Sequence, residues 1–174
     1  LKDVAAGTKI GFTDRNYATA TEFAGITNES AFLWTADQNY AAGTIVTIQP
    51  DVATGTNPLA DKGTTQGAGG GLSTTAETVY AFLGEIAALA NGSAGAVTLT
   101  QMLASLNVGG AAAGDVPAAI GATSVSLSLD NARFNGSFDY NDLPAFLLAV
   151  DNPASWQTND TTAFALVNNS LFPV

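Results

Sequence analysis

The chain has 174 residues, with five Lys and Arg against fifteen Asp and Glu, a formal net charge of −10, no histidine and no cysteine. The absence of His and Cys excludes Ser/His/Asp and Cys/His nucleophiles, zinc sites built on imidazole or thiolate, and redox thiols. The acidity argues against nucleic acid and anionic membranes as partners, because both are bound through clustered Lys and Arg.

The surface must be covered by small neutral residues, because only 11% of the residues are charged while 47% are hydrophobic. This composition is common in exported β proteins and in subunits whose outer faces are buried by neighbours. The sequence contains no apolar run of about 18 residues, which a membrane-spanning helix would need. The chain opens on Leu1 and not on Met, which we interpret as the product of a processed export precursor. We therefore expect one secreted, extracellular or cell-surface domain over residues 1–174.

The first predicted elements repeat each other. Residues 5–14, AAGTKIGFTD, are answered by residues 41–49, AAGTIVTIQ. In each copy a glycine supplies a turn, and the alternation of Ile10 with Phe12, or of Val46 with Ile48, predicts a strand with one apolar face. The alternative is coincidence in a chain rich in Ala, Gly and Thr, and the copies are too short to demonstrate a duplicated domain.

Further short strands are predicted along the chain, each bounded by turn-forming residues, at 31–35, 78–83, 123–129 and 161–167. Residues 51–72 are polar and rich in glycine, which predicts a long surface loop. Residues 101–108 fit a strand or a helix equally well. This succession favours an all-β fold, namely an Ig-like or jelly-roll-like β-sandwich.

One short helix is expected near residues 142–150. Asn141 or Asp142 can cap its N-terminus, and Pro144 falls in the first turn, where a missing N–H is tolerated. The sequence DNP at 151–153 ends it. We expect its apolar face to cover one end of the sandwich.

The densest set of candidate oxygen ligands for Ca²⁺ consists of Asp130, Asn131, Asp139, Asn141 and Asp142. The set lacks the glycine and the final glutamate of an EF-hand loop, and turn formation or helix capping is the alternative. Asp14, Asp37 and Asp51, near predicted strand ends, are open to the same two interpretations.

An enzyme is the less favoured class. A hydrolase would need two carboxyls that face each other across a cleft. Glu77 with Glu85, or Asp139 with Asp142, are the pairs to consider, and nothing in the sequence distinguishes either pair from solvated turn residues. We therefore expect no catalytic residues and no cofactor, with Ca²⁺ as the one alternative.

Aromatic residues and glycosylation motifs raise the question of glycans. Core packing is expected for Trp34 and Tyr80, whereas Tyr40 and Tyr140 are expected to be freer for a carbohydrate-binding platform. The acceptor pattern Asn-x-Ser/Thr occurs at Asn28, Asn91, Asn135, Asn159 and Asn168.

Five motifs follow one another in order: AAGTxIxFTD from residue 5, LWTA from 33, AAGTxV from 41, DNAxFNG from 130 and DNPASW from 151. Together they resemble a group of secreted bacterial β domains found in large cell-surface and exported proteins. The resemblance covers nearly the whole chain. It implies an extracellular β module and brings no catalytic residues with it.

Two departures from that pattern lead to a functional hypothesis. The pattern usually includes a strand before the position of Leu1, and a sandwich without it would expose an unpaired edge and an apolar groove. The segment 163–174 carries apolar residues suited to a donated strand, namely Phe164, Leu166, Leu171, Phe172 and Val174. A trimmed chain, or a chain that closes its own edge, is the alternative to exchange between subunits.

The sequence therefore predicts a secreted structural subunit, a homo-oligomer or homopolymer that assembles through β-strand edges into an extracellular filament or surface layer. The alternative is a calcium- or glycan-binding adhesion module of a larger cell-surface protein. Neither a nucleic-acid partner nor membrane insertion is expected.

Overall fold

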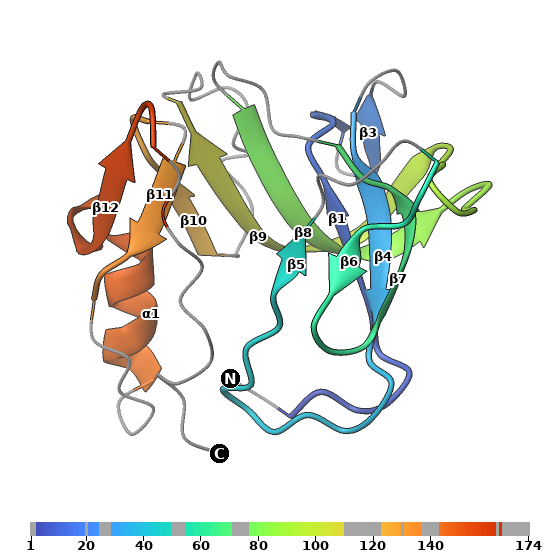
Figure 1. Ribbon diagram of the computed structural model, residues 1–174, viewed down its shortest axis with the longest axis horizontal. Helices are drawn as coiled ribbons and strands as arrows, with labels where there is room; N and C mark the ends of the chain where they lie inside the picture. The colour runs from blue at the N-terminus through green and yellow to red at the C-terminus, as the bar shows by residue number, and fades with distance from the viewer. Residues whose placement is uncertain are drawn as a thin grey trace.

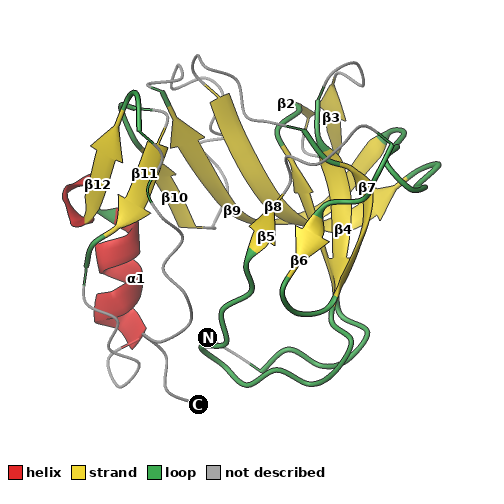
Figure 2. Ribbon diagram, in the orientation of Figure 1, coloured by secondary structure: helices red, strands yellow, loops and turns green. Residues whose placement is uncertain are grey.

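The computed structural model of the protein describes residues 3–19, 21–24, 29–49, 55–70, 77–109, 123–129, 131–136, 143–162 and 164. Strands make up most of the regular structure, and they are accompanied by one short helix (Figures 1 and 2). This confirms the predicted all-β fold. Within the described residues, no helix has the length and apolar character needed to cross a membrane.

The largest sheet has eight strands. Seven of them follow the order β2-β3-β9-β8-β1-β4-β7, and the eighth, β10, pairs with β9 in parallel orientation. All other pairs of neighbouring strands in this sheet are antiparallel. The strands are β1 (Lys9–Thr13), β2 (Asn16–Thr19), β3 (Glu22–Ala24), β4 (Ala31–Thr35), β7 (Thr64–Ala68), β8 (Glu77–Ile86), β9 (Val97–Val108) and β10 (Thr123–Ser126). The residues 101–108, which fitted a strand or a helix, are part of β9.

The sheet is strongly curled, as the link between β1 and β2 shows. These strands are consecutive in the chain, yet β8, β9 and β3 lie between them in the sheet. In a flat sheet they would be about 19 Å apart. Asp14 and Arg15 alone join them, and the three residue steps from Thr13 to Asn16 span at most about 11 Å. The two parts of the sheet therefore approach each other across a concave interior.

Aromatic side chains fill this concave interior. Phe23 on β3 packs against Tyr80 and Phe82 on β8, with ring centroids 5.1 and 5.5 Å apart. The Phe82 ring packs directly on Gly11 of β1. A Cβ atom at position 11 would lie 2.3 Å from the ring, so a side chain there would clash with it. The buried cluster consists of Phe23, Ala31, Leu33, Tyr80, Phe82, Ile86, Val97, Leu99 and Met102.

A small second layer covers part of the opposite face of the sheet. It consists of β5 (Ile48–Gln49) paired with β6 (Leu59–Ala60), and Figure 1 shows it in front of the strands β1, β4 and β8. Trp34, Ala36 and Tyr40 form the buried centre of this interface. β4 is consequently buried on both faces.

A separate helix-bearing unit lies beside β10 (Figure 2). It contains β11 (Asn131–Phe134), α1 (Leu143–Asp151), a single turn of 3₁₀ helix (Pro153–Ser155) and β12 (Trp156–Asn159). Phe134 meets Phe146 and Trp156 edge-on, with centroids 6.0 and 5.4 Å apart. The helix was predicted, and Pro144 falls in its first turn. Its apolar surface is only partly covered, since Leu148 is 72% exposed.

Two predictions about elements were wrong. The segment 51–72, predicted to be a surface loop, contributes β6 and β7 within its described residues. Its Thr-rich stretch pairs along the whole of β4 and thereby supplies backbone partners to a strand buried on both faces. In the predicted strand 161–167, the described residues Thr161, Thr162 and Phe164 lie outside any strand, and the other four positions are not described; the nearest described strand is β12.

Candidate functional site

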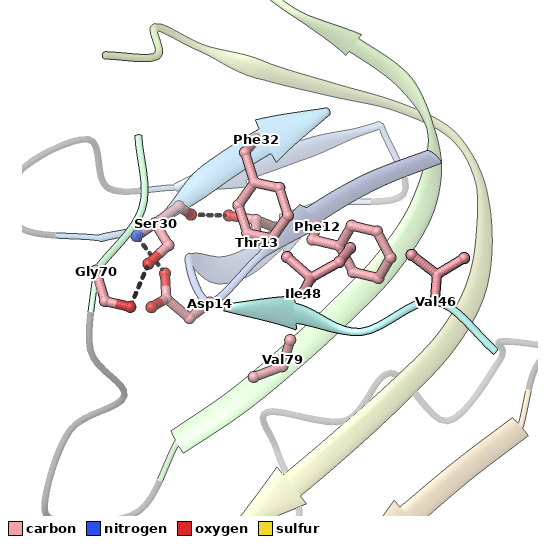
Figure 3. Close-up of a pocket in the computed structure, with 9 residues that line it drawn as sticks. All are labelled: Phe12, Thr13, Asp14, Ser30, Phe32, Val46, Ile48, Gly70 and Val79. Carbon is pink, nitrogen blue, oxygen red and sulfur yellow. Dashed lines mark hydrogen bonds between the residues drawn. The ribbon is translucent and has the colours of Figure 1, made fainter. Parts of the chain in front are cut away.

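An apolar groove of about 310 Å³ opens between the second layer and the outer face of the large sheet (Figure 3). Phe12, Phe32 and Val79 reach it from β1, β4 and β8, and Val46 and Ile48 reach it from the segment that forms β5. The rings of Phe12 and Phe32 stack with centroids 5.3 Å apart. The remaining lining residues are Thr13, Asp14, Ser30 and Gly70. We call this feature the apolar groove.

The internal repeat of the sequence builds one side of the groove. In both copies of the AAGT sequence the threonine N–H donates to the carbonyl of the first alanine at 3.1 Å. The two bonds run from Thr8 to Ala5 and from Thr44 to Ala41. The glycines that precede Thr8 and Thr44 have φ values of +82° and +90°, a conformation that only glycine adopts without strain. The prediction that both copies begin with a glycine turn is therefore confirmed.

The two turns also face each other and exchange equivalent contacts, as two copies related by a local two-fold axis do. Val4 and Tyr40 exchange backbone hydrogen bonds of 2.8 Å. Asn39 Oδ1 accepts the Ala6 N–H at 2.9 Å, and Asp3 Oδ1 accepts the equivalent Ala42 N–H at 2.8 Å. We call this arrangement the double turn. It holds the chain that leads into β5 above β1, which explains why residues from both copies line the groove.

Three carboxylates meet at one end of the groove. Oxygen atoms of Asp14, Glu29 and Glu77 all lie within 4.8 Å of one another. Asp14 follows β1, Glu29 precedes β4 and Glu77 opens β8. Because β1 runs antiparallel to both neighbours, its end lies beside their beginnings. We call this group the acidic cluster.

Asp14 is the buried member of the acidic cluster, with 8% of its surface exposed. Its Oδ1 accepts the Ser30 N–H at 2.5 Å, and the Thr13 hydroxyl donates to the Ser30 carbonyl at 2.7 Å (Figure 3). Burial raises the pKa of Asp14, while the bonds from Ser30 oppose the rise. Burial also raises the pKa of Glu29, and the charges of Asp14 and Glu77 add to that rise.

Arg15 lies next to the acidic cluster but is directed elsewhere. It is 1% exposed, and its guanidinium donates to the Gly95 carbonyl and, at 3.1 Å, to the Ala94 carbonyl. Burial lowers the pKa of Arg15, while the charges of Asp14 and Glu29 raise it. In the described part of the chain the only ion pair within 4 Å joins Lys62 and Asp61. The acidic cluster is therefore not neutralised by a contact with Arg15.

The residues predicted for calcium and for assembly are only partly described. Asn131 lies on β11 and donates its side-chain N–H to the Asn159 carbonyl at 3.1 Å. The Phe164 ring lies 5.2 Å from the guanidinium carbon of Arg133, a cation–π contact within the chain. The others lie outside the described residues: Asp130, Asp139, Asn141, Asp142, Leu166, Leu171, Phe172 and Val174.

The glycosylation motifs differ in accessibility. Asn91 and Asn135 are exposed, whereas Asn159 is half-buried. Asn159 Oδ1 accepts the N–H groups of Thr161 and Thr162, both at 2.8 Å. Asn28 and Asn168 lie outside the described residues.

The aromatic predictions had mixed outcomes. Trp34 and Tyr80 are buried, as predicted. The prediction that Tyr40 is freer was wrong, because the double turn places its ring 5.9 Å from that of Trp34. Its hydroxyl donates to Asp37 at 2.5 Å, and this bond, together with partial desolvation, raises the pKa of Tyr40. Tyr140 is not among the described residues.

The acidic cluster was not recognised from the sequence as a group. Asp14 was singled out for its place at a strand end and Glu77 as half of a hypothetical pair with Glu85, but Glu29 carried no signal. Forty-eight positions separate Glu29 from Glu77 in the sequence. Only the order of β4, β1 and β8 brings the three together.

Comparisons of the chain with protein-family models, with curated proteins and with solved structures find no match. The resemblance to secreted bacterial β modules therefore stays a prediction. The function has to be argued from the apolar groove and the acidic cluster.

Proposed function

We propose that the protein is a secreted structural subunit that assembles when an extended apolar segment of one copy enters the apolar groove of another. The groove carries the proposal, because Phe12, Phe32, Val46, Ile48 and Val79 present apolar surface beside a second layer of only two short described strands. Each Leu or Phe side chain fully buried there contributes about 1.5–3 kcal/mol. The entropic cost of joining two copies offsets part of this gain.

The ends of the large sheet favour the groove over simple edge-to-edge pairing. At the β7 edge, Asn57 Oδ1 accepts the Gly67 N–H at 3.1 Å, and the buried Pro58 accepts the Thr65 hydroxyl. The β2 edge has four residues and a register shift between Tyr17 and Thr19. Short, irregular or capped edges resist pairing with other chains.

We assign the occupant of the groove to the segment 163–174 of a second copy. Residues 161–174 include no Lys, Arg, Asp or Glu, which suits a groove with apolar walls and an acidic end. From Phe164, which Arg133 anchors, the following ten residues reach at most about 36 Å when extended. Leu166, Leu171, Phe172 and Val174 supply the apolar side chains.

Light scattering over a range of protein concentrations tests this assignment. We expect the whole chain to associate reversibly, and we expect association to be lost in Ile48→Asn and in a chain that ends at Thr162. Leu148→Ser, which changes an exposed apolar residue on α1, is the matched control and should associate like the parent. Circular dichroism verifies that each variant is folded.

Two results would contradict the proposal. A parent chain that stays monomeric at high concentration removes self-assembly altogether. Association that survives both Ile48→Asn and the shortened chain, but is lost in Leu148→Ser, moves the interface to α1.

The acidic cluster favours a second candidate function, that of a calcium-binding adhesion module. Ca²⁺ binds six to eight oxygen atoms, carboxylates among them, and three carboxylates already lie within 4.8 Å of one another here. Calorimetric titration with Ca²⁺ should then show binding that Glu29→Gln weakens and Asn131→Ala leaves unchanged. An unaltered melting temperature in excess Ca²⁺ removes this candidate.

A further inference from the structure

The second layer has a strand edge beside the apolar groove that pairs with no other described strand. β5 pairs with β6 on one side only, and in the described part of the chain these two strands form a sheet of their own. We call the other side the open edge of β5. We propose that the segment 163–174 of the second copy binds as a β-strand paired with this open edge and becomes the third strand of the second layer. The inference rests on the proposed function and adds how the occupant of the groove is held and selected.

The backbone bonds around β5 show which groups lie at its open edge. The Thr47 carbonyl accepts the Asp61 N–H at 3.1 Å, and the Thr47 N–H donates to Asp61 Oδ1 at 2.7 Å. The polar groups of Thr47 therefore face β6, and Ile48 and Ala60 form a pair without direct hydrogen bonds. Because successive residues of an extended chain direct their N–H and C=O groups to opposite sides, those of Val46 and Ile48 face away from β6. Among the described residues, these groups have no hydrogen-bond partner.

The open edge of β5 points toward β8. β6 lies against β7, and the large sheet continues from β7 through β4 and β1 to β8. Ile48 of β5 and Val79 of β8 both line the groove, and Figure 1 shows β5 on the β8 side of β6. A strand added beside β5 lies one strand spacing, about 4.8 Å, farther in this direction. It would therefore cover the outer face of β8.

The outer face of β8 offers the apolar surface that an added strand needs. Tyr80 and Phe82 point into the buried interior, so Val79, Ala81 and Leu83, which alternate with them, share the outer face. All three are half-buried, and each keeps exposed surface that an added strand can bury. The apolar wall of the groove therefore continues along β8, beside the open edge of β5.

The sequence of the proposed occupant suits a strand with one apolar face. In an extended chain Leu166, Phe172 and Val174 share one side, with Asn168 and Ser170 between them. When a strand is added to a sheet edge, backbone bonds supply affinity and alternate side chains supply specificity. We therefore expect the groove and β8 to receive the apolar side of the segment, while the open edge of β5 supplies the backbone bonds.

Synthetic peptides of residues 165–174 test the pairing as competitors for the association of the whole chain, which light scattering follows. The unmodified peptide should block association. Two further peptides carry N-methyl groups on the amides of Leu166 and Asn168, or on those of Val167 and Asn169, and keep every side chain. One of them should need at least about a tenfold higher concentration to block association, because it loses two backbone bonds to β5. The other is its matched control and should act like the unmodified peptide, since its methylated amides face away from β5.

Hydrogen exchange of the whole chain, below and above the concentration of association, supplies a second measurement. The amides of Val46 and Ile48 should exchange more slowly after association, because they gain partners. The Thr47 amide is already bonded to Asp61 and should keep its rate. In Ile48→Asn, which is expected not to associate, the Val46 amide should exchange equally fast at both concentrations.

Two methylated peptides that block association equally well, or that lose their effect equally, would overturn the pairing with β5. Association without slower exchange at Val46 and Ile48 would overturn it as well. These results leave the proposed function standing, provided that the unmodified peptide blocks association. An unmodified peptide without effect on a chain that associates, or a chain that does not associate at all, overturns the proposed function and the pairing together.

Discussion

At the scale of single residues, Asp14 and Glu29 reverse the pH dependence that acidic groups usually give to a folded protein. Burial raises both pKa values above the ordinary 3.8 and 4.5, so the native state holds these protons more tightly than the unfolded chain does. The resulting stabilisation is complete below the unfolded-chain pKa values, and it is lost as the pH rises through the native ones.

We therefore expect Asp14→Asn to gain stability relative to the parent as the pH rises from acidic to neutral. The gain approaches about 1.4 kcal/mol for each pH unit by which the native pKa exceeds the unfolded one. Urea unfolding at several pH values measures it, with Asp151→Asn as the control. A difference between Asp14→Asn and the parent that stays constant with pH would contradict this interpretation.

The burial of individual residues could be predicted only where the local pattern determines it. Trp34 and Tyr80 lie in apolar strands, and the prediction that they are core residues is confirmed. Tyr40 lies outside any strand, and its burial depends on the backbone bonds that it exchanges with Val4. The acidic cluster has the same origin, since its members meet through the pairing of distant strands.

At the scale of elements, the repeat of the AAGT sequence predicts two turns but not their partnership. Glycine at the third position of a turn is a local requirement that the sequence displays. The contacts of Asp3 with Ala42 and of Asn39 with Ala6 form only when the two copies face each other. β7 was missed for a similar reason, because its polar, Gly-containing sequence becomes a strand through pairing with β4.

The cap on β7 gives a prediction at this scale. Asn57→Ala removes the acceptor of the Gly67 N–H and, at 3.4 Å, of the Gly92 N–H, and so leaves the Gly67 N–H at the β7 edge unpaired. We expect the variant to lose about 1 kcal/mol of stability and to aggregate with a β-rich circular dichroism spectrum. Asn39→Ala is the matched control, since it also removes one side-chain acceptor, that of the Ala6 N–H, away from the sheet edges. Equal aggregation in the two variants would show that the cap does not protect the edge.

At the scale of the whole molecule, the all-β class could be predicted because many short strands and turn signals recur along the chain. The strand order could not be predicted, since the crossing from β1 to β2 through Asp14 and Arg15 requires a curled sheet that no local pattern specifies. The same crossing buries Arg15 against carbonyls of the turn between β8 and β9. Arginine is rarely buried without an ion pair, so composition alone could not predict this position of Arg15.

The two parts of the described structure differ in burial, and this difference predicts two levels of stability. The large sheet encloses a buried aromatic core, whereas the described side chains of the helix-bearing unit are all half-buried or exposed. Regions with little buried apolar surface open at lower free energy than the core does. We therefore expect the helix-bearing unit to unfold before the large sheet.

The two tryptophans allow this order to be measured, because Trp34 lies in the large sheet and Trp156 in the helix-bearing unit. In Trp34→Phe the fluorescence of Trp156 should change at a lower urea concentration than the fluorescence of Trp34 does in Trp156→Phe. Since each substitution also perturbs its own region, hydrogen exchange of the parent is the control. Its β11 and β12 amides should exchange faster than those of β8 and β9. Coincident transitions and uniform exchange would instead mean that the helix-bearing unit and the sheet unfold as one cooperative structure.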